Sequence, residues 1–228
     1  MLELFTANGI WAVLITAAAF QLGRFLQKKT GWTLCNPLLI SVAALIPFLL
    51  LTGVPNESYQ SSMSAISWLM TPCTICFAIP MYRHLQALKG RLWAVIAGVV
   101  AGTASSLLSV GALCLLFRLD AVTTWSLLPK SVTTAIAQPL SESMGGLVPL
   151  TTAVVAVTGL VGAVTGPLLC RLLRLTDPVA VGVAYGTASH VIGTTKATEA
   201  DPVSGAVSSL SLIIAGLLTA VIFPFLPV

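Results

Sequence analysis

The feature that most constrains this chain is a series of long apolar runs with very few charged residues. Only 8% of its residues are charged, against about 25% in a soluble domain. A helix needs roughly 20 apolar residues to cross a bilayer. The sequence therefore predicts an all-α, polytopic membrane protein with roughly six to eight transmembrane segments in a single integral membrane domain, residues 1–228. The predicted helices are 9–27, 37–53, 64–82, 92–117, 148–170 and 204–226.

Two segments between these runs differ from ordinary spans and from ordinary loops. Residues 128–147 and 182–203 are rich in Gly, Ser, Thr and Pro, but they keep enough apolar residues to enter a membrane. Basic residues in membrane proteins gather on the cytoplasmic side. If the clusters at 24–29, 83–91 and 171–174 all lie there, both polar segments must enter and leave on one side, as re-entrant segments. If one cluster lies elsewhere, they become broken spanning helices.

An ungapped internal repeat links the two polar segments. Each repeat is a polar, broken segment followed by a long apolar helix, and re-entrant segments would give the two repeats opposite orientations. Inverted repeats of this kind form the midplane substrate site of many secondary transporters. We therefore expect residues 121–228 to be a transport core and residues 1–120 a helical scaffold. A shift of 57 residues aligns Glu142 with Glu199, Thr151 with Ser208, Gly159 with Gly216, and Pro167 with Pro224.

Both broken segments combine hydroxyl groups with a cation, which suits the binding of a small carboxylate. Broken helices also expose N–H groups at half-helix N-termini, where the helix dipole attracts anions. Asn36, before Pro37, caps the second helix, and a break there would face the pathway. The candidate substrate-binding residues are Asn36, Lys130, Ser131, Thr133, Thr134, Thr187, Ser189, His190, Gly193 and Thr194.

Several candidates also have a purely structural interpretation. Lys130 is compatible with a side chain that extends to the membrane edge, and His190 with a hydrogen-bonded packing residue. Acidic groups and histidine within a membrane suggest ion coupling, so His190, Glu142 and Glu199 are candidate proton or cation sites. Glu199 is equally typical of a solvated loop end, because Asp201 and Pro202 follow it.

Enzymatic and metal-binding functions receive little support from the sequence. It has no HExxH, GxSxG or Walker motif and no intramembrane Asp pair, so we expect neither an enzyme nor a bound cofactor. Cys73 and Cys76 form a CxxC pair without the further ligands of a structural zinc site, so we interpret the cysteines as packing residues and expect no metal. The net charge of +4 lies in the basic clusters, which indicate topology rather than nucleic-acid binding.

Four blocks of this sequence resemble the LrgB/CidB family, and the resemblance covers essentially the whole chain in the right order. It implies a multi-pass protein of the bacterial cytoplasmic (inner) membrane. The family is similar to the C-terminal half of the plastid glycolate/glycerate transporter, and bacterial relatives are associated with pyruvate and related acids. The blocks are Asn36-Pro37-Leu38-Leu39, Leu128 to Thr134, Gly186 to His190 with Gly193-Thr194, and Glu199 through Gly205-Ala206 to Gly216.

The resemblance implies two competing functions. One is a secondary transporter of small organic anions such as glycolate, glycerate or pyruvate, coupled to protons or cations. The other is an antiholin-like regulator of murein hydrolase export and autolysis, or an accessory subunit of an LrgA/CidA-type partner. The residues favour transport, because a pore of self-associating helices needs no paired polar segments with a cation in each. Since the chain is short for a transporter, we expect a homodimer or an LrgA/CidA-like small membrane partner, within the lipid bilayer.

Overall fold

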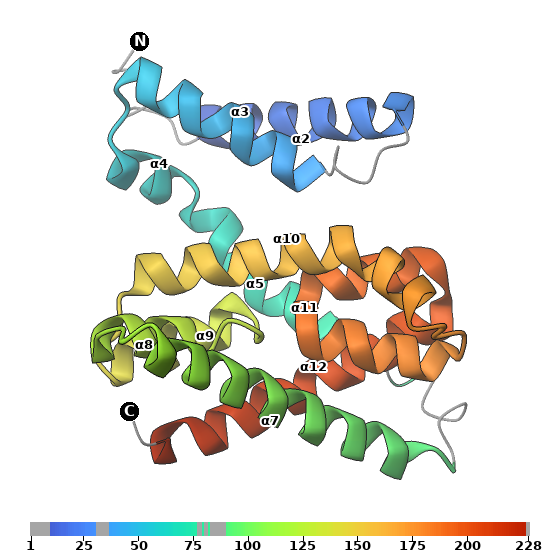
Figure 1. Cartoon of the computed structure of the whole chain (residues 1–228). Coiled ribbons are helices and arrows are strands. Elements are labelled where there is room, and N and C mark those ends of the chain that lie inside the picture. Colours follow the sequence, from blue (N-terminus) through green and yellow to red (C-terminus); the bar gives the residue numbers. More distant parts are fainter. Residues whose placement is uncertain (1–9, 31–36, 77–78, 80–81, 83–89, 227–228) are drawn as a thin grey trace. The chain divides into compact units, whose positions relative to one another are not determined.

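The computed structural model describes residues 10–30, 37–76, 79, 82 and 90–226, and it is helical throughout these ranges apart from turns. This confirms the predicted all-α class. The chain divides into two compact units, Met1–Cys76 and Phe77–Val228 (Figure 1). The predicted roles of residues 1–120 as scaffold and 121–228 as transport core remain predictions.

Unit 1 contains four described helices: α2 (Ile10–Thr30), α3 (Pro37–Thr52), α4 (Asn56–Ser62) and α5 (Ser64–Cys76). Helices α2 and α3 pack closely because Gly23 has no side chain; a Cβ atom there would lie 2.7 Å from Pro37 Cα. The Thr16 and Tyr59 hydroxyls form a 2.6 Å hydrogen bond that joins α2 to α4. These helices match the first three predicted runs, except that parts of 77–82 lie outside the described residues.

Unit 2 contains α7 (Leu92–Leu116), α8 (Ala121–Leu127), α9 (Thr134–Ser143), α10 (Val148–Leu172), α11 (Pro178–Ala200), α12 (Pro202–Ile222) and the short 3-10 helix η2 (Phe223–Phe225). Among the described helices, α2, α7, α10 and α12 with η2 are long and apolar enough to cross a membrane, and Leu39–Thr52 of α3 is a shorter apolar helix. The chain is therefore a multi-pass membrane protein.

The first polar segment forms a hairpin, which we call hairpin A (residues 121–147). After α7 ends, α8 turns back along it, and Trp125 and Leu128 pack against Leu107 and Val110. The tip reaches the middle of α7, where Ser131 is hydrogen bonded to Ser106 at 2.7 Å. Helix α9 then returns along α10. The Leu147 N–H donates to Ser126 Oγ at 2.7 Å, so the hairpin leaves on the side where it entered.

The second polar segment forms hairpin B (residues 178–200), whose two limbs are the halves of α11. The helix breaks at His190, where the backbone has φ 41° and ψ −135°. Ser204, at the start of α12, donates its hydroxyl proton to the carbonyl of Pro178, at the start of α11, over 2.9 Å. The chain therefore returns to its point of entry. Both segments are therefore hairpins whose two ends lie together, the geometry expected of the re-entrant alternative.

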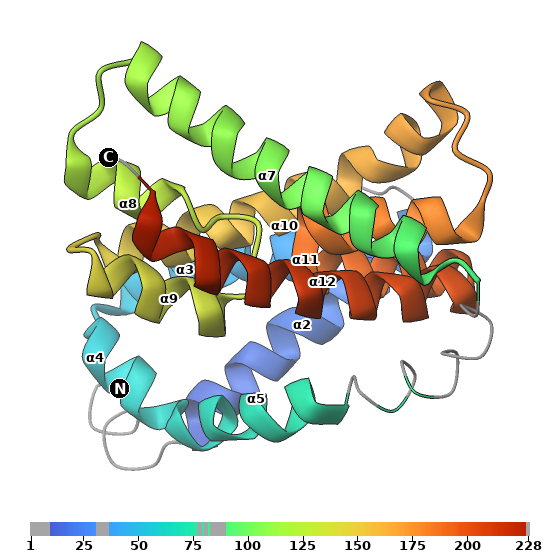
Figure 2. The same ribbon diagram turned by 90° about the horizontal axis from the view of Figure 1, so that it is seen from below.

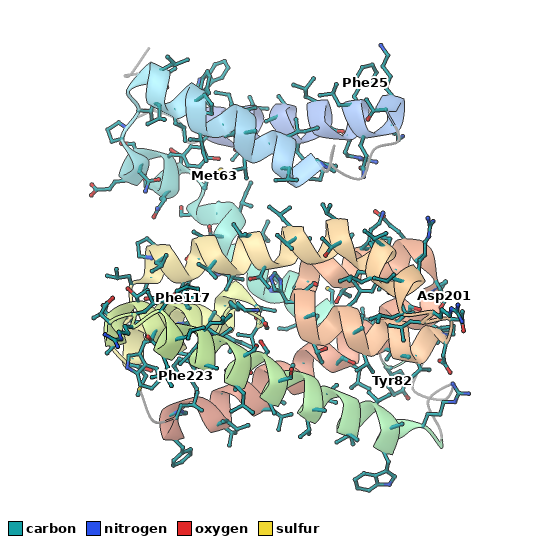
Figure 3. The ribbon with its side chains drawn as sticks, in the orientation of Figure 1. Phe25, Met63, Tyr82, Phe117, Asp201 and Phe223 are labelled. Carbon is teal, nitrogen blue, oxygen red and sulfur yellow. The ribbon has the colours of Figure 1, made fainter. Side chains whose placement is uncertain are left out.

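The two hairpins enter from opposite faces of unit 2. Arg91, just before α7, pairs with Asp177, just before α11, at 2.7 Å. This face, which we call the basic face, therefore holds both ends of hairpin B and the start of α12. Figure 3 shows Asp201 at this end, and Phe117 and Phe223 at the other end, where hairpin A enters. Helix α10 runs away from the hairpin A face and α12 runs away from the basic face (Figure 2), as the inverted repeat predicts.

The repeat also has a local counterpart in hydrogen bonding. Thr151 of α10 donates to Ser141 on the return limb of hairpin A at 2.7 Å. Its repeat partner, Ser208 of α12, is hydrogen bonded to Thr194 on the return limb of hairpin B at 2.8 Å. Buried hydroxyl pairs therefore fix each hairpin to the long helix that follows it.

Candidate functional site

The tips of the two hairpins meet near the middle of unit 2, between α7 and α12. Ser131 from hairpin A and Thr187 from hairpin B line one small cavity, together with Thr103, Ser106 and Thr219. Its volume is about 10 Å³, which is enough for about one water molecule and far too little for an organic acid. Thr103 Oγ1 is buried there without a hydrogen-bond partner, and a single water would satisfy it.

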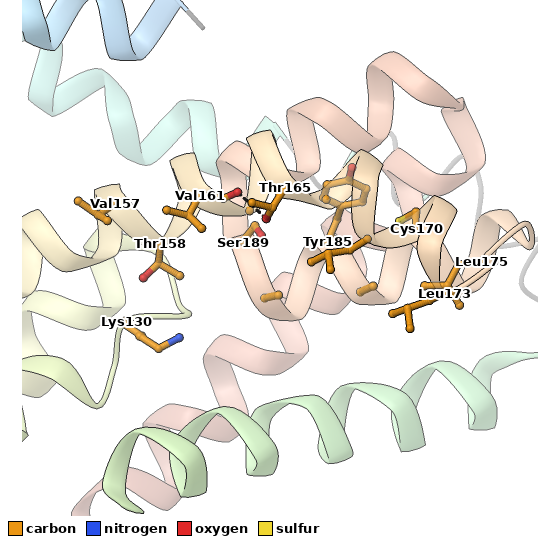
Figure 4. Close-up of a pocket in the computed structure, with 15 residues that line it drawn as sticks. Lys130, Val157, Thr158, Val161, Thr165, Cys170, Leu173, Leu175, Tyr185 and Ser189 are labelled. Carbon is orange, nitrogen blue, oxygen red and sulfur yellow. Dashed lines mark hydrogen bonds between the residues drawn. The ribbon is translucent and has the colours of Figure 1, made fainter. Parts of the chain in front are cut away.

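A larger cavity of about 430 Å³ lies between α10 and the first limb of hairpin B. Lys130 lies at one end of it and Leu173 and Leu175 at the other (Figure 4). Ser189 and Tyr185 contribute hydroxyl groups to its wall, and most of the remaining lining is apolar. The size falls within the usual range of small-molecule sites. Two predicted residues, Lys130 and Ser189, therefore share a real cavity.

Lys130 lies in the turn between α8 and α9, next to Ser131 at the tip of hairpin A. Its side chain is half-buried, and its Nζ donates to Ser131 Oγ at 3.3 Å. The ion pairs of the described residues are Arg91–Asp177 and Lys196–Glu199, so no described carboxylate neutralises Lys130. A half-buried cation without a counter-charge attracts an anion. The tip position also places Lys130 away from the hairpin end, where a side chain would reach the membrane edge.

Two half-helices begin at these tips. Helix α9 starts after Thr133, whose side chain makes no capping hydrogen bond, and the second limb of hairpin B starts after His190. The first N–H groups of a helix lack intrahelical partners, and its N-terminal end carries partial positive charge. Both half-helices thus direct donors toward the meeting point of the tips, close to predicted residues Thr133 and Thr134.

His190 shapes the turn of hairpin B. The residue is 4% exposed, and its Nε2 lies 2.9 Å from the carbonyl oxygen of Val155. Because a carbonyl only accepts, Nε2 carries a proton and donates it to Val155. The ring packs on Gly159 of α10, where a Cβ atom would lie 2.6 Å from Cε1. Thr194 donates to the His190 carbonyl at 2.9 Å, which ties the turn to the second limb.

Glycines on α10 create room for the cavity wall. A Cβ atom at Gly162 would overlap the Ser189 side chain, and one at Gly166 would lie 2.5 Å from the Tyr185 ring. The sequence analysis did not select Gly162, Gly166 or Tyr185. The four-residue spacing of the two glycines in an apolar helix is the signal of a close helix contact, although it does not identify the partner helix.

The other predicted residues differ in burial: Gly193 is buried, whereas Glu142 and Glu199 are exposed. Gly193 lets the two limbs of hairpin B touch, since a Cβ atom there would lie 2.5 Å from Ser189 Cβ. Glu142 and Glu199 are exposed near the entry ends of their hairpins. Glu199 forms an ion pair with Lys196, with 2.9 Å between Oε2 and Nζ. Asn36 lies outside the described residues. The binding and ion-coupling roles of all these residues remain predictions.

Fixed charges mark both faces of unit 2. A hydrogen bond from the Val179 N–H lowers the pKa of Asp177, and the Arg91 side chain lowers it further. Hydrogen bonds from Thr123 similarly lower the pKa of Asp120, at the entry of hairpin A. Each carboxylate caps a helix N-terminus, a position that favours its charged form. The helix entries on both faces are therefore held by ionised caps.

These features define a multi-pass membrane protein with paired, oppositely oriented re-entrant hairpins. The chain belongs to the LrgB-like family, whose model matches residues 16–228. It is 35% identical to "Uncharacterized protein YwbG" of Bacillus subtilis (strain 168) over 218 residues, which are 96% of this chain and 97% of the relative. It is 32% identical to "Antiholin-like protein LrgB" of the same organism over 220 residues, 96% and 95% of the two chains. No solved structure matches it.

Proposed function

We propose that this chain is a secondary transporter of small organic anions in the bacterial cytoplasmic membrane. The observation that carries the proposal is the convergence of Lys130 and two half-helix N-termini at the tips of oppositely oriented hairpins. Paired discontinuous helices of this kind provide anion sites near the bilayer midplane in other transporters. The substrate class is small monocarboxylates, and pyruvate, glycolate and glycerate are the members that we would test first.

The chemistry of the tips supports an anion rather than a neutral or cationic substrate. Half-helix N-termini, hydroxyl groups and an ammonium group all donate hydrogen bonds, and a carboxylate only accepts them. Hydrogen bonds to a charged group contribute about 1.5–3 kcal/mol each, so a few of them offset the loss of carboxylate hydration. The acid would bind at the Lys130 end of the larger cavity.

Opposite hairpins also suit alternating access. Hairpin A reaches the tips from one face and hairpin B from the other, so movement of unit 2 relative to a scaffold would open one path at a time. Coupling to protons or cations would involve His190, Glu142 or Glu199. A homodimer or an LrgA/CidA-like partner would supply further scaffold.

A second candidate function is favoured by the name of one relative, an antiholin-like protein. On that account the chain regulates murein hydrolase export and autolysis, alone or as an accessory subunit of an LrgA/CidA-like partner. It requires association of membrane helices and no particular chemistry at the hairpin tips. The two functions therefore differ in their dependence on Lys130.

Uptake of labelled pyruvate, glycolate and glycerate into proteoliposomes with and without a pH gradient tests the proposal. We expect saturable uptake by the purified chain and its loss in Lys130→Met, which keeps the side-chain length but removes the charge. Lys196→Met is the matched control, because that cation is already paired with Glu199. Both variants should keep the folded state of the wild-type chain, measured by thermal unfolding in detergent.

The opposite result has an equally clear meaning. Absence of uptake for every acid, also after addition of an LrgA/CidA-like partner, would contradict the transporter proposal. Release of a trapped dye by the wild type and by Lys130→Met alike would then favour a pore-forming or regulatory protein.

A further inference from the structure

We propose that the larger cavity takes a monocarboxylate with an apolar chain of about five to eight carbons, in preference to a two- or three-carbon acid such as pyruvate. This inference rests on the proposed anion site at Lys130 and specifies the substrate class of that site. It is carried by three properties of the cavity: its volume, the chemistry of its walls and the position of its single cation.

The volume exceeds what a very small acid fills. The cavity measures about 430 Å³, whereas a three-carbon acid occupies roughly the volume of three or four water molecules, each about 30 Å³ in the liquid. The cavity is an open groove, since Val161, Leu169 and Leu173 on its wall are exposed, and such an acid at Lys130 would leave most of it without ligand contacts. A branched acid of about six carbons fills much more of it.

The walls beyond the Lys130 end favour hydrocarbon. Moving toward the basic face, the cavity is lined by Val161, Leu169 and Leu173 of the α10 region and by Ala184 and Ala188 of hairpin B. Water beside these side chains has few hydrogen-bond partners, so its replacement by a methyl or methylene group is favourable. Each buried methylene group is expected to strengthen binding about fourfold.

The position of the cation restricts the ligand to one charged end. Among the cavity residues that the structure describes, Lys130 is the charged one, and it lies at the end opposite Leu173 and Leu175. A dicarboxylate would place its second charge farther along the mostly apolar wall, where the lining offers the hydroxyl groups of Thr165, Tyr185 and Ser189 but no second cation. Charge complementarity thus points to an amphipathic monoanion whose carboxylate faces Lys130 and whose chain extends along α10.

Ala184 offers a way to shorten the cavity without altering its charged end. Its side chain lines the cavity, so Ala184→Leu adds bulk where the chain of the ligand would lie. Ala180 is one helical turn earlier on the same limb, is exposed and lies outside the lining. Ala180→Leu is therefore a matched control for the added volume and hydrophobicity.

The test measures binding and uptake separately on the purified full chain. Equilibrium dialysis with labelled 4-methyl-2-oxopentanoate and labelled pyruvate gives the two affinities, and proteoliposome uptake gives transport of each acid. Because the branched acid has three more carbons than pyruvate, we expect it to bind about 60-fold more tightly. Ala184→Leu should remove this preference while leaving pyruvate binding unchanged, and Ala180→Leu should preserve it.

Three results would overturn the inference. They are equal or tighter binding of pyruvate, an Ala184→Leu effect that is absent or the same for both acids, and binding of the branched acid that survives Lys130→Met. The last would mean that the groove accepts lipid chains without recognising a carboxylate. Pyruvate uptake without a chain-length preference would refute this inference alone. Tight binding of the branched acid without uptake of any acid would refute only the transport proposal.

Discussion

Hairpins A and B follow similar paths from opposite faces, but they are held in place by different means. Hairpin A turns through residues 128–133, and its outer limb packs through large side chains such as Trp125, whose ring lies 5.3 Å from that of Phe223. Hairpin B turns at the single residue His190 and packs on α12 almost backbone to backbone. A Cβ atom at Gly182 would lie 2.6 Å from the Ser204 carbonyl oxygen.

The difference indicates a division of roles. Side chains such as Trp125 can repack when a helix shifts, whereas contacts through glycine backbones leave no space for adjustment. We expect hairpin B and α12, which touch through glycine backbones, to form a rigid frame around Ser189 and His190. Hairpin A, which carries Lys130, is the element whose small displacement would alter the charge at the cavity. Four experiments test this contrast.

The largest expected effect comes from filling the backbone contact of hairpin B. The Cβ atom of Gly186→Ala would meet the Ser208 carbonyl oxygen and lie 2.7 Å from Ser211 Cβ, so α11 and α12 must separate. We expect the free energy of unfolding to fall by about 3 kcal/mol, measured by SDS or thermal unfolding in mixed micelles. Gly111→Ala is the control, since its nearest neighbour is Leu128 at 3.9 Å. Equal stability of the two variants would remove the argument for a rigid frame.

The second test compares the cations of the two hairpins. Lys130→Met removes a cation without a described counter-charge, and we expect carboxylate affinity to fall about 10- to 100-fold, the value of a lost hydrogen bond to a charged group. Lys196→Met removes one that is partly exposed and paired with Glu199, so its effect should stay below about twofold. Dialysis with the labelled acid measures both. Similar losses of carboxylate affinity in both variants would show that Lys130 has no special role in binding the anion.

The third test concerns the turn at His190, whose positive φ is unfavourable for a residue with a side chain. Both His190→Ala and His190→Gly lose the ring and its bond to Val155, but glycine also relieves the backbone strain. We expect the glycine variant to be about 1 kcal/mol more stable than the alanine variant. In a regular helix the order is reversed. If chemical or thermal unfolding shows that His190→Ala is more stable than His190→Gly, the sharp turn at this residue is contradicted.

The smallest expected effect is at the basic face. Because the pKa of Asp177 is lowered on folding from its usual 3.8, its contribution to stability is present above that value and is lost as the pH falls through the lower, folded-state pKa. Asp177→Asn should therefore be slightly less stable than wild type at pH 7, and the difference should disappear in strong acid. Melting curves across this range, at low and high salt, measure it. A pH-independent difference would indicate a role in packing rather than in charge.

The sequence alone predicted much of this architecture, because membrane helices produce a strong local signal. The six apolar runs correspond to described helices apart from the undescribed part of 77–82, and the polar composition of 128–147 and 182–203 correctly marked both segments as interrupted. The sidedness that the basic clusters indicate remains a prediction. The cavity wall was not predicted, since it depends on which helices meet. Gly162 and Gly166 are informative only once Tyr185 and Ser189 are known to pack on them. The break at His190 also lacks a local signal, because histidine rarely adopts positive φ and only tertiary contacts maintain it.

The shared midpoint of the hairpin tips has an electrical consequence. Lys130 neighbours Ser131, which contacts Ser106 in the middle of α7, so an anion bound there lies roughly halfway through the low-dielectric region. A single charge crossing the full membrane potential changes energy by about 2.3 kcal/mol per 100 mV, so each half of the journey accounts for about 1 kcal/mol. A negative-inside potential would thus oppose import of the bare anion in two nearly equal steps. Movement together with one proton would be insensitive to voltage.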